Sequence, residues 1–108
     1  MNVDVTPNAF APLVGTTVAV AANSSGVTVS LNTGGTQIRF YNSGTVPAFA
    51  AWGTGSSSAK VPSGATLGDM PIVPGAIEVF NKQWTDNVLS MITASSSATV
   101  YVTVGNGV

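Results

Sequence analysis

The chain has 108 residues and very few charges, with three Lys or Arg, four Asp or Glu and a formal net charge of -1. Charged residues make up 6% of the sequence, against about 25% in an ordinary soluble domain. The length suits one domain with one modest core. No basic cluster is present that could neutralise phosphates, so neither nucleic acid nor an anionic membrane is expected as a partner.

Reactive side chains are scarce as well. The chain has no cysteine and no histidine, which excludes disulfides, thiolate chemistry and the commonest general base and metal ligand. The acidic residues Asp4, Asp69, Glu78 and Asp86 are spread along the sequence. Asp86 suits a turn, and Glu78 is expected on the solvent face of a strand. We therefore predict no catalytic residue, no metal site and no cofactor.

Residues 1–15 predict an extended N-terminal arm, followed by a single domain over residues 16–108. Two prolines favour an extended backbone in the arm. Phe10 and Leu13 supply apolar anchors without a regular pattern. The arm is expected either to lie across its own domain or to reach a neighbouring subunit.

The amino terminus does not have the pattern of a targeting segment. Asp4 stands where a secretion signal would carry basic residues. No apolar run reaches the roughly 18 residues of a membrane-spanning helix. We expect the chain to be made in the cytoplasm and either to stay there or to leave within a larger assembly.

Alternation of apolar and polar residues dominates the domain and predicts an all-β fold, because no segment shows the apolar spacing of a helix. Residues 18–20 and 27–31 alternate on either side of the turn NSSG and predict a hairpin. In QIRFYN, Ile38 and Phe40 fall on the face opposite Tyr41.

The middle of the chain predicts strands separated by one long loop. AFAAWG, residues 48–53, is apolar on both faces, which indicates a strand covered twice. Residues 54–68 are rich in Ser and Gly and predict a surface loop. DMPIVPG has two prolines, which suit a sheet edge or an irregular approach to the next strand and exclude a central strand. AIEVFN supplies the next strand, and KQWTDN forms a turn around an exposed Trp84.

The last part of the chain contains the clearest strand. VLSMITA predicts one strand, and in ATVYVTVGNG three valines, Val100, Val102 and Val104, face away from Tyr101. In total we expect about seven or eight short strands at spacings near 8 to 12 residues. This pattern indicates an antiparallel β-sandwich or a small barrel.

Several large side chains exceed what one small core can hold. Interface cores are enriched in aromatic residues and depleted in charge, so we interpret this set as candidate contacts with other chains. Each of them could instead close an end of the sandwich within one subunit. The candidate interface residues are Phe10, Leu13, Tyr41, Trp52, Phe80 and Trp84.

The second half of the chain carries three strand-and-turn segments in the order IRFYNSGTVPAFAAWG, MPIVPGAIEVF and MITASSSATVYVTVGNGV. In this order they resemble small virion proteins of tailed bacteriophages and prophages, among them capsid decoration, or cement, proteins with a jelly-roll or related β-sandwich fold. The resemblance covers residues 37–108. It implies a non-enzymatic protein that binds the major capsid protein on the outer capsid surface, forms a dimer or trimer, and reinforces the shell.

We therefore expect a jelly-roll-like virion protein that is made in the host cytoplasm and lies on the capsid surface. A second hypothesis is a fibre or tail-associated module that binds a host glycan, with Trp52, Trp84 or Tyr41 against a sugar ring. A small hydrolase is a third, and it has no histidine, thiol or clustered carboxylates on which to build.

Overall fold

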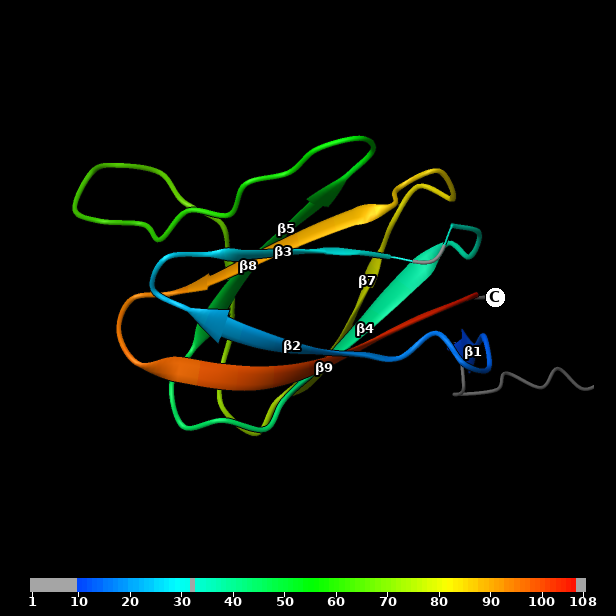
Figure 1. The fold of residues 1–108 in the computed structure, drawn as a ribbon, viewed down its shortest axis with the longest axis horizontal. Helices are drawn as coiled ribbons and strands as arrows, with labels where there is room; N and C mark the ends of the chain where they lie inside the picture. Colours follow the sequence, from blue (N-terminus) through cyan, green and yellow to red (C-terminus); the bar gives the residue numbers. More distant parts are fainter. Residues whose placement is uncertain (1–9, 32, 107–108) are drawn as a thin grey trace, which may run out of the picture.

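The structure, a computed structural model, describes residues 10–31 and 33–106, and these residues form nine strands and no helix (Figure 1). The all-β class predicted from the sequence is confirmed. The strands are β1 (Ala11–Pro12), β2 (Val18–Asn23), β3 (Val27–Ser30), β4 (Gln37–Asn42), β5 (Ala48–Gly53), β6 (Met70–Ile72), β7 (Ile77–Asn81), β8 (Val88–Thr93) and β9 (Ser97–Asn106). Across these described ranges, no helix has the length and apolarity to cross a membrane.

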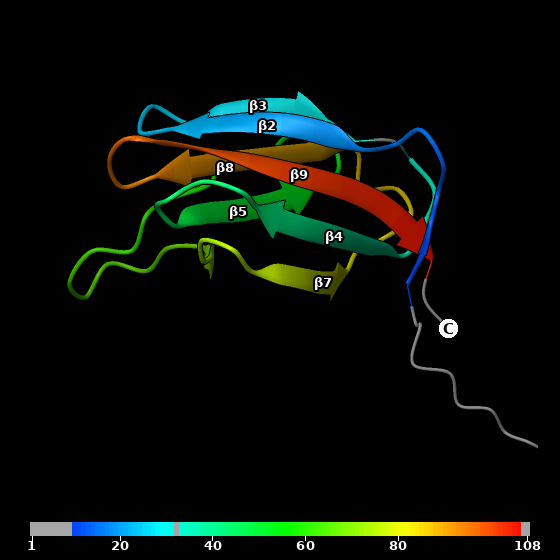
Figure 2. The same cartoon turned by 90° about the horizontal axis from the view of Figure 1, so that it is seen from below.

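The strands form two layers that a single residue pair joins (Figure 2). One layer has the order β2-β9-β4-β7, with β1 paired to the end of β9, and the other has the order β3-β8-β5-β6. Asn23 of β2 and Ile92 of β8 form the one parallel pair, which closes the strands into a nearly barrel-shaped path. Consecutive strands from β2 onward change layers except between β5 and β6, which makes the order jelly-roll-like.

The core lies between the layers and is built from alternate residues of each strand. Ile38 and Phe40 of β4 are fully buried, as are Val100, Val102 and Val104 of β9. Their neighbours in sequence point outward, as strand geometry requires. The faces predicted for these two strands are confirmed.

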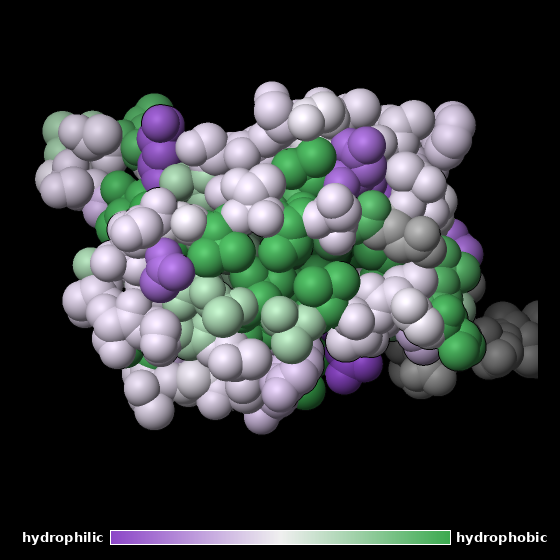
Figure 3. Space-filling model, viewed as in Figure 1, coloured by the Kyte–Doolittle hydropathy of each residue, from purple (hydrophilic) through white to green (hydrophobic). Residues whose placement is uncertain are grey.

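The hairpin predicted for residues 18–31 is wrong. β2 pairs with β9 and β3 pairs with β8, so the turn between β2 and β3 crosses from one layer to the other. Apolar alternation specifies a strand and its buried face, but not its partner. Half-buried Val18, Val27 and Val29 pack against the core. Figure 3, in the view of Figure 1, shows an apolar surface in the middle of this side of the molecule.

A buried asparagine fixes the connection from β4 to β5. The side chain of Asn42 is fully buried, and its Nδ2 donates to the carbonyls of Val46 at 3.0 Å and Ile72 at 2.8 Å. Its Oδ1 accepts from the backbone amide of Gly44 at 2.9 Å. A Cβ on Gly44 would lie 2.7 Å from the Cβ of Ala98, so only glycine allows this turn to approach β9. The buried amide is therefore paired on both sides.

Residues 54–68 form the predicted surface loop, and the loop has internal order. The backbone amide of Lys60 donates to Oδ2 of Asp69 at 2.6 Å, and the amide of Asp69 donates to the carbonyl of Lys60 at 2.9 Å. Ser63 and Thr66 form a short antiparallel bridge further out. The loop projects beyond the sandwich at the end opposite the C-terminus (Figure 1).

Residues 10–13 of the predicted arm lie against their own domain. β1 pairs with the end of β9, and Leu13 packs against the core. The ring of Phe10 covers Gly105, where a Cβ would come within 2.7 Å of it. Residues 1–9 lie outside the described part, so the rest of the arm prediction stays a prediction.

Substituting Val102 with Asp should unfold the domain. Val102 is fully buried in the core, and a lone buried carboxylate costs several kcal/mol against a total stability of about 5 to 15 kcal/mol. Thr99→Asp places the same charge on the exposed face of the same strand and should leave the fold intact. Circular dichroism and urea unfolding of the two variants check this, and a folded Val102→Asp protein would contradict the face assignment of β9.

Candidate binding face

The outer face of the β2-β9-β4-β7 layer carries a row of side chains across four adjacent strands. The register pairs Ala19 with Tyr101, Tyr101 with Tyr41, and Tyr41 with Ile77. Residues directly opposite on neighbouring antiparallel strands have Cβ atoms about 4.5 to 5.5 Å apart, so their side chains interact. The row therefore forms one continuous apolar and aromatic surface on a rigid sheet.

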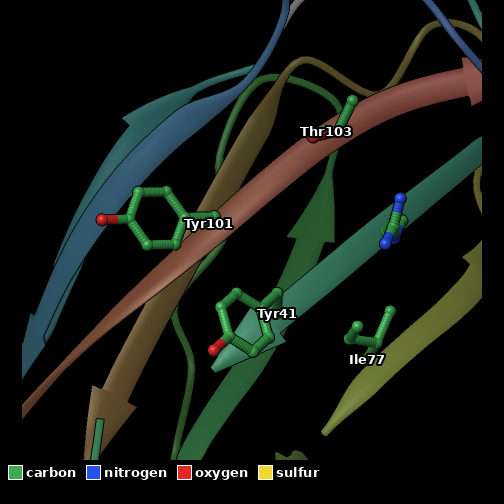
Figure 4. A pocket seen from close by; sticks show the side chains of 5 residues that line it. Tyr41, Ile77, Tyr101 and Thr103 are labelled. Carbon is green, nitrogen blue, oxygen red and sulfur yellow. The ribbon is translucent and has the colours of Figure 1, made fainter. Parts of the chain in front are cut away.

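The two tyrosines dominate this surface. Their ring centroids are 6.2 Å apart and their planes differ by 16°, and Figure 4 shows the rings side by side on neighbouring strands. Tyr41 is 39% exposed and Tyr101 is 43% exposed. A shallow hollow of about 250 Å³ lies among them, and we call its lining the tyrosine face: Arg39, Tyr41, Ile77, Tyr101 and Thr103.

A single cation lies on the tyrosine face. Arg39 is exposed and stands between Thr103 of β9 and Val79 of β7 in the register. The hydroxyl of Thr103 shares a 2.7 Å hydrogen bond with that of Thr17, which ties this part of the face to the segment before β2. The face therefore offers a guanidinium and a hydroxyl beside two aromatic rings.

The structure places Trp52 and Phe80 against the core, although sequence patterning indicated interface positions for them. Both are half-buried and pack on Phe40, with ring centroids at 5.5 Å and 5.8 Å from its ring. Trp52 and Phe80 also lie 5.8 Å apart. Three rings thus close the space between the layers, and an interface role for the two half-buried ones stays a prediction.

The other predicted interface residues are dispersed. Trp84 is 65% exposed in the turn between β7 and β8, whereas Phe10 and Leu13 lie beside the end of β9. Of the predicted set, Tyr41 alone belongs to the tyrosine face. Whether the dispersed residues contact other chains stays a prediction.

The orientation of β7 differs from the sequence-based prediction. Glu78 is half-buried on the inner side with Phe80, whereas Ile77 and Val79 are 55% and 41% exposed. The physical reason is the aromatic cluster, because Phe80 turned inward packs against the rings of Phe40 and Trp52, and aromatic pairs stabilise beyond the area they bury. Sequence patterning alone missed Ile77 as a surface residue, and the pairing register with Tyr41 is the signal that locates it.

The described acidic residues form no cluster that could hold a metal ion, and Asp4 lies outside the described part of the chain. Within residues 10–31 and 33–106, no group of three or more His, Cys, Asp or Glu side chains could hold a metal ion. Asp86 instead stabilises its turn, since Oδ2 accepts from the backbone amide of Gln83 at 2.9 Å and Oδ1 accepts from Oγ1 of Thr54 at 3.0 Å. This agrees with the turn role predicted for Asp86.

The buried lysine, Lys82, also stabilises loops of the fold. Nζ of Lys82 donates to the carbonyls of Gly34 at 3.1 Å, Gly35 at 3.4 Å and Gln83 at 2.9 Å. Burial lowers the pKa of Lys82 below its ordinary value of 10.5, and the nearby charge of Asp86 opposes that change. The ammonium thus holds the loop before β4 to the turn after β7.

Comparison with known proteins adds no relative. No protein-family model, no curated protein and no solved structure matches the chain.

Replacing Lys82 with Met should lower the free energy of unfolding by about 1 to 3 kcal/mol, because the carbonyls it serves lose their donor while still partly buried. Lys60→Met is the matched control, since Lys60 is exposed on the long loop and its removal should change stability little. Urea unfolding of both variants measures the difference. Equal effects would contradict the structural role of Lys82.

Proposed function

We propose that this chain is a non-enzymatic structural protein of a tailed-bacteriophage virion that attaches to the outer surface of the capsid shell through the tyrosine face. The observation that carries the proposal is the continuous exposed row of Ala19, Tyr101, Tyr41 and Ile77 on one sheet. A contiguous exposed apolar surface rimmed by polar residues is typical of a protein contact. The resemblance of residues 37–108 to decoration proteins supplies the kind of partner.

The scaffold of the tyrosine face suits attachment to a large preformed surface. Four of its five side chains stand on central strands β9 and β4, each hydrogen-bonded on both sides, and Ile77 stands on the neighbouring strand β7. Binding therefore orders no loop, and this lowers the entropic penalty of association. Tyrosine and arginine are also the residue types that most often dominate binding energy. Tyr41, Tyr101 and Arg39 lie together here.

The low charge of the chain sets how such an attachment should respond to salt. With a net charge of -1 and one exposed cation on the tyrosine face, long-range electrostatic steering is weak. Contact area and shape would supply most of the affinity. Binding to the shell should therefore change little between low and high ionic strength.

The double variant Tyr41→Ala with Tyr101→Ala should lose shell binding, because both central rings of the contact are removed. Loss of a dominant contact is worth about 2 kcal/mol or more, roughly a thirtyfold drop in affinity. Co-sedimentation with empty shells assembled from the major capsid protein of the same genome measures this. The double variant Tyr41→Phe with Tyr101→Phe keeps both rings and is the matched control.

Two further results bear on this proposal. Trp84→Ala removes an exposed aromatic residue outside the tyrosine face, so it should leave the protein folded and still bound to the shell. If the native protein does not co-sediment, or if Trp84→Ala alone abolishes binding, attachment through the tyrosine face is wrong.

A specific observation also favours a glycan-binding module as a second candidate function. The two tyrosine rings are nearly parallel with centroids 6.2 Å apart, and they form a platform rather than a closed pocket. Aromatic faces carry negative potential that attracts the polarised C–H bonds of a sugar ring. Arg39 and Thr103 beside the rings could donate hydrogen bonds to sugar hydroxyls.

If the glycan function holds, oligosaccharides released from the host cell surface should shift the amide resonances of β4 and β9 in NMR titrations. Tyr101→Ala should abolish the shifts because one ring of the platform is lost, whereas Tyr101→Phe should keep them. A protein that binds shells and shows no shift with any such oligosaccharide would exclude this second function.

A further inference from the structure

The backbone of β7 has one paired and one unpaired side. At the two ends of the β4–β7 pairing, the amide of Asn42 donates to the carbonyl of Ala76 and the amide of Lys82 donates to the carbonyl of Thr36. In an antiparallel pair, hydrogen-bonded positions alternate along the strand. Residues 76, 78, 80 and 82 therefore direct their backbone groups toward β4.

The intervening residues of β7 direct their amides and carbonyls the other way. These residues are Ile77, Val79 and Asn81. Within the part of the chain that the structure describes, β7 is the last strand of its layer and pairs only with β4. Figure 2 shows β7 at the margin of the layer, far from β2 and β3. A ladder of backbone donors and acceptors thus lies at this edge.

Natural sheet edges are usually blunted by Pro, by Lys, by a bulge or by an inward-pointing charge. Of these, β7 has only the inward-pointing charge, on Glu78. Its register with β4 is uninterrupted from Ile77 to Asn81. The edge strand β6 of the other layer, by contrast, contains Pro71. The single charge of β7, on Glu78, lies on the inner, half-buried side. The exposed side chains of this edge strand, Ile77, Val79 and Asn81, therefore carry no charge.

We propose that β7 pairs with β7 of a second copy of this chain, antiparallel across a two-fold axis at Val79. In this register Val79 faces Val79 of the second copy, and Ile77 faces Asn81. It is the one register that uses all the outward backbone groups of both strands. The β2-β9-β4-β7 layers of the two copies then join into one continuous sheet, with the exposed side chains of Ile77 and Val79 on its outer face.

The charges and the side chains fit a second copy. The register places Glu78 opposite Phe80 of the second copy, so the two Glu78 carboxylates do not stand directly opposite each other. A net charge of -1 per chain gives little repulsion between copies. The β7 edge of a second copy has the same outward backbone amides and carbonyls, so the donors of each copy can hydrogen-bond to the acceptors of the other. This inference does not rest on the proposed attachment to a capsid.

Charge variants at Val79 test the register directly. Val79 is 41% exposed, so Val79→Lys and Val79→Glu should both fold, which circular dichroism checks. The native protein should sediment as a dimer across a concentration series, and each variant alone should sediment as a monomer, because like charges face each other at the axis. A mixture of the two variants should recover the dimer. Ala21→Lys, on the exposed face of β2, is the control that should stay dimeric.

Amide exchange gives a second measurement that needs no variant. In the native dimer, the amides of Ile77, Val79 and Asn81 should exchange more slowly as protein concentration rises. The inference is overturned by a native protein that stays monomeric at every concentration, by variants that remain dimers, or by a mixture that fails to reassociate. It is also overturned if exchange at these three amides is independent of concentration.

Discussion

The alternation and register of β9 are the constraint on which the rest of the layer depends. β9 pairs with β1, β2 and β4, and its valines supply three fully buried core residues. A slip of one residue would exchange the buried and exposed faces of the strand. Because antiparallel pairs face the same side, the position of Val102 in the core fixes Tyr101 outside, and Tyr101 fixes Tyr41 beside it.

The same register extends to the edge of the sheet. Tyr41 lies directly opposite Ile77 in the β4–β7 pairing. The backbone of β4 hydrogen-bonds to the amides and carbonyls on one side of β7 and leaves those on the other side unpaired within the described residues. The exposed row and the unpaired edge are therefore not independent features, because both follow from one alignment of β9. The few charges of the chain do little to mask either of them. The buried lysine and the turn aspartate stabilise loops, and Arg39 alone lies on the tyrosine face.

Much of the fold follows from local pattern, and the remainder depends on pairing. Period-two alternation located the buried faces of β4 and β9, and two prolines excluded a central strand where the structure has the edge strand β6. Which strands pair is a long-range matter, so the hairpin between β2 and β3 was predicted wrongly. The orientation of β7 depends on contacts among the rings of Phe40, Trp52 and Phe80 between the layers. The apolar pattern of the five residues of β7 gives no information about these contacts, because Phe40 and Trp52 lie on other strands.

The tyrosine face and the β7 edge become related when two copies pair. The local two-fold axis of an antiparallel strand pair runs perpendicular to the sheet, so both tyrosine faces would point the same way. A capsid lattice presents identical binding points at fixed spacings. Once one tyrosine face of a dimer had bound, the second would bind as an intramolecular event at a high effective concentration. A weak, nearly uncharged contact could then suffice for stable attachment. Edge pairing would thus supply the avidity that electrostatics does not provide.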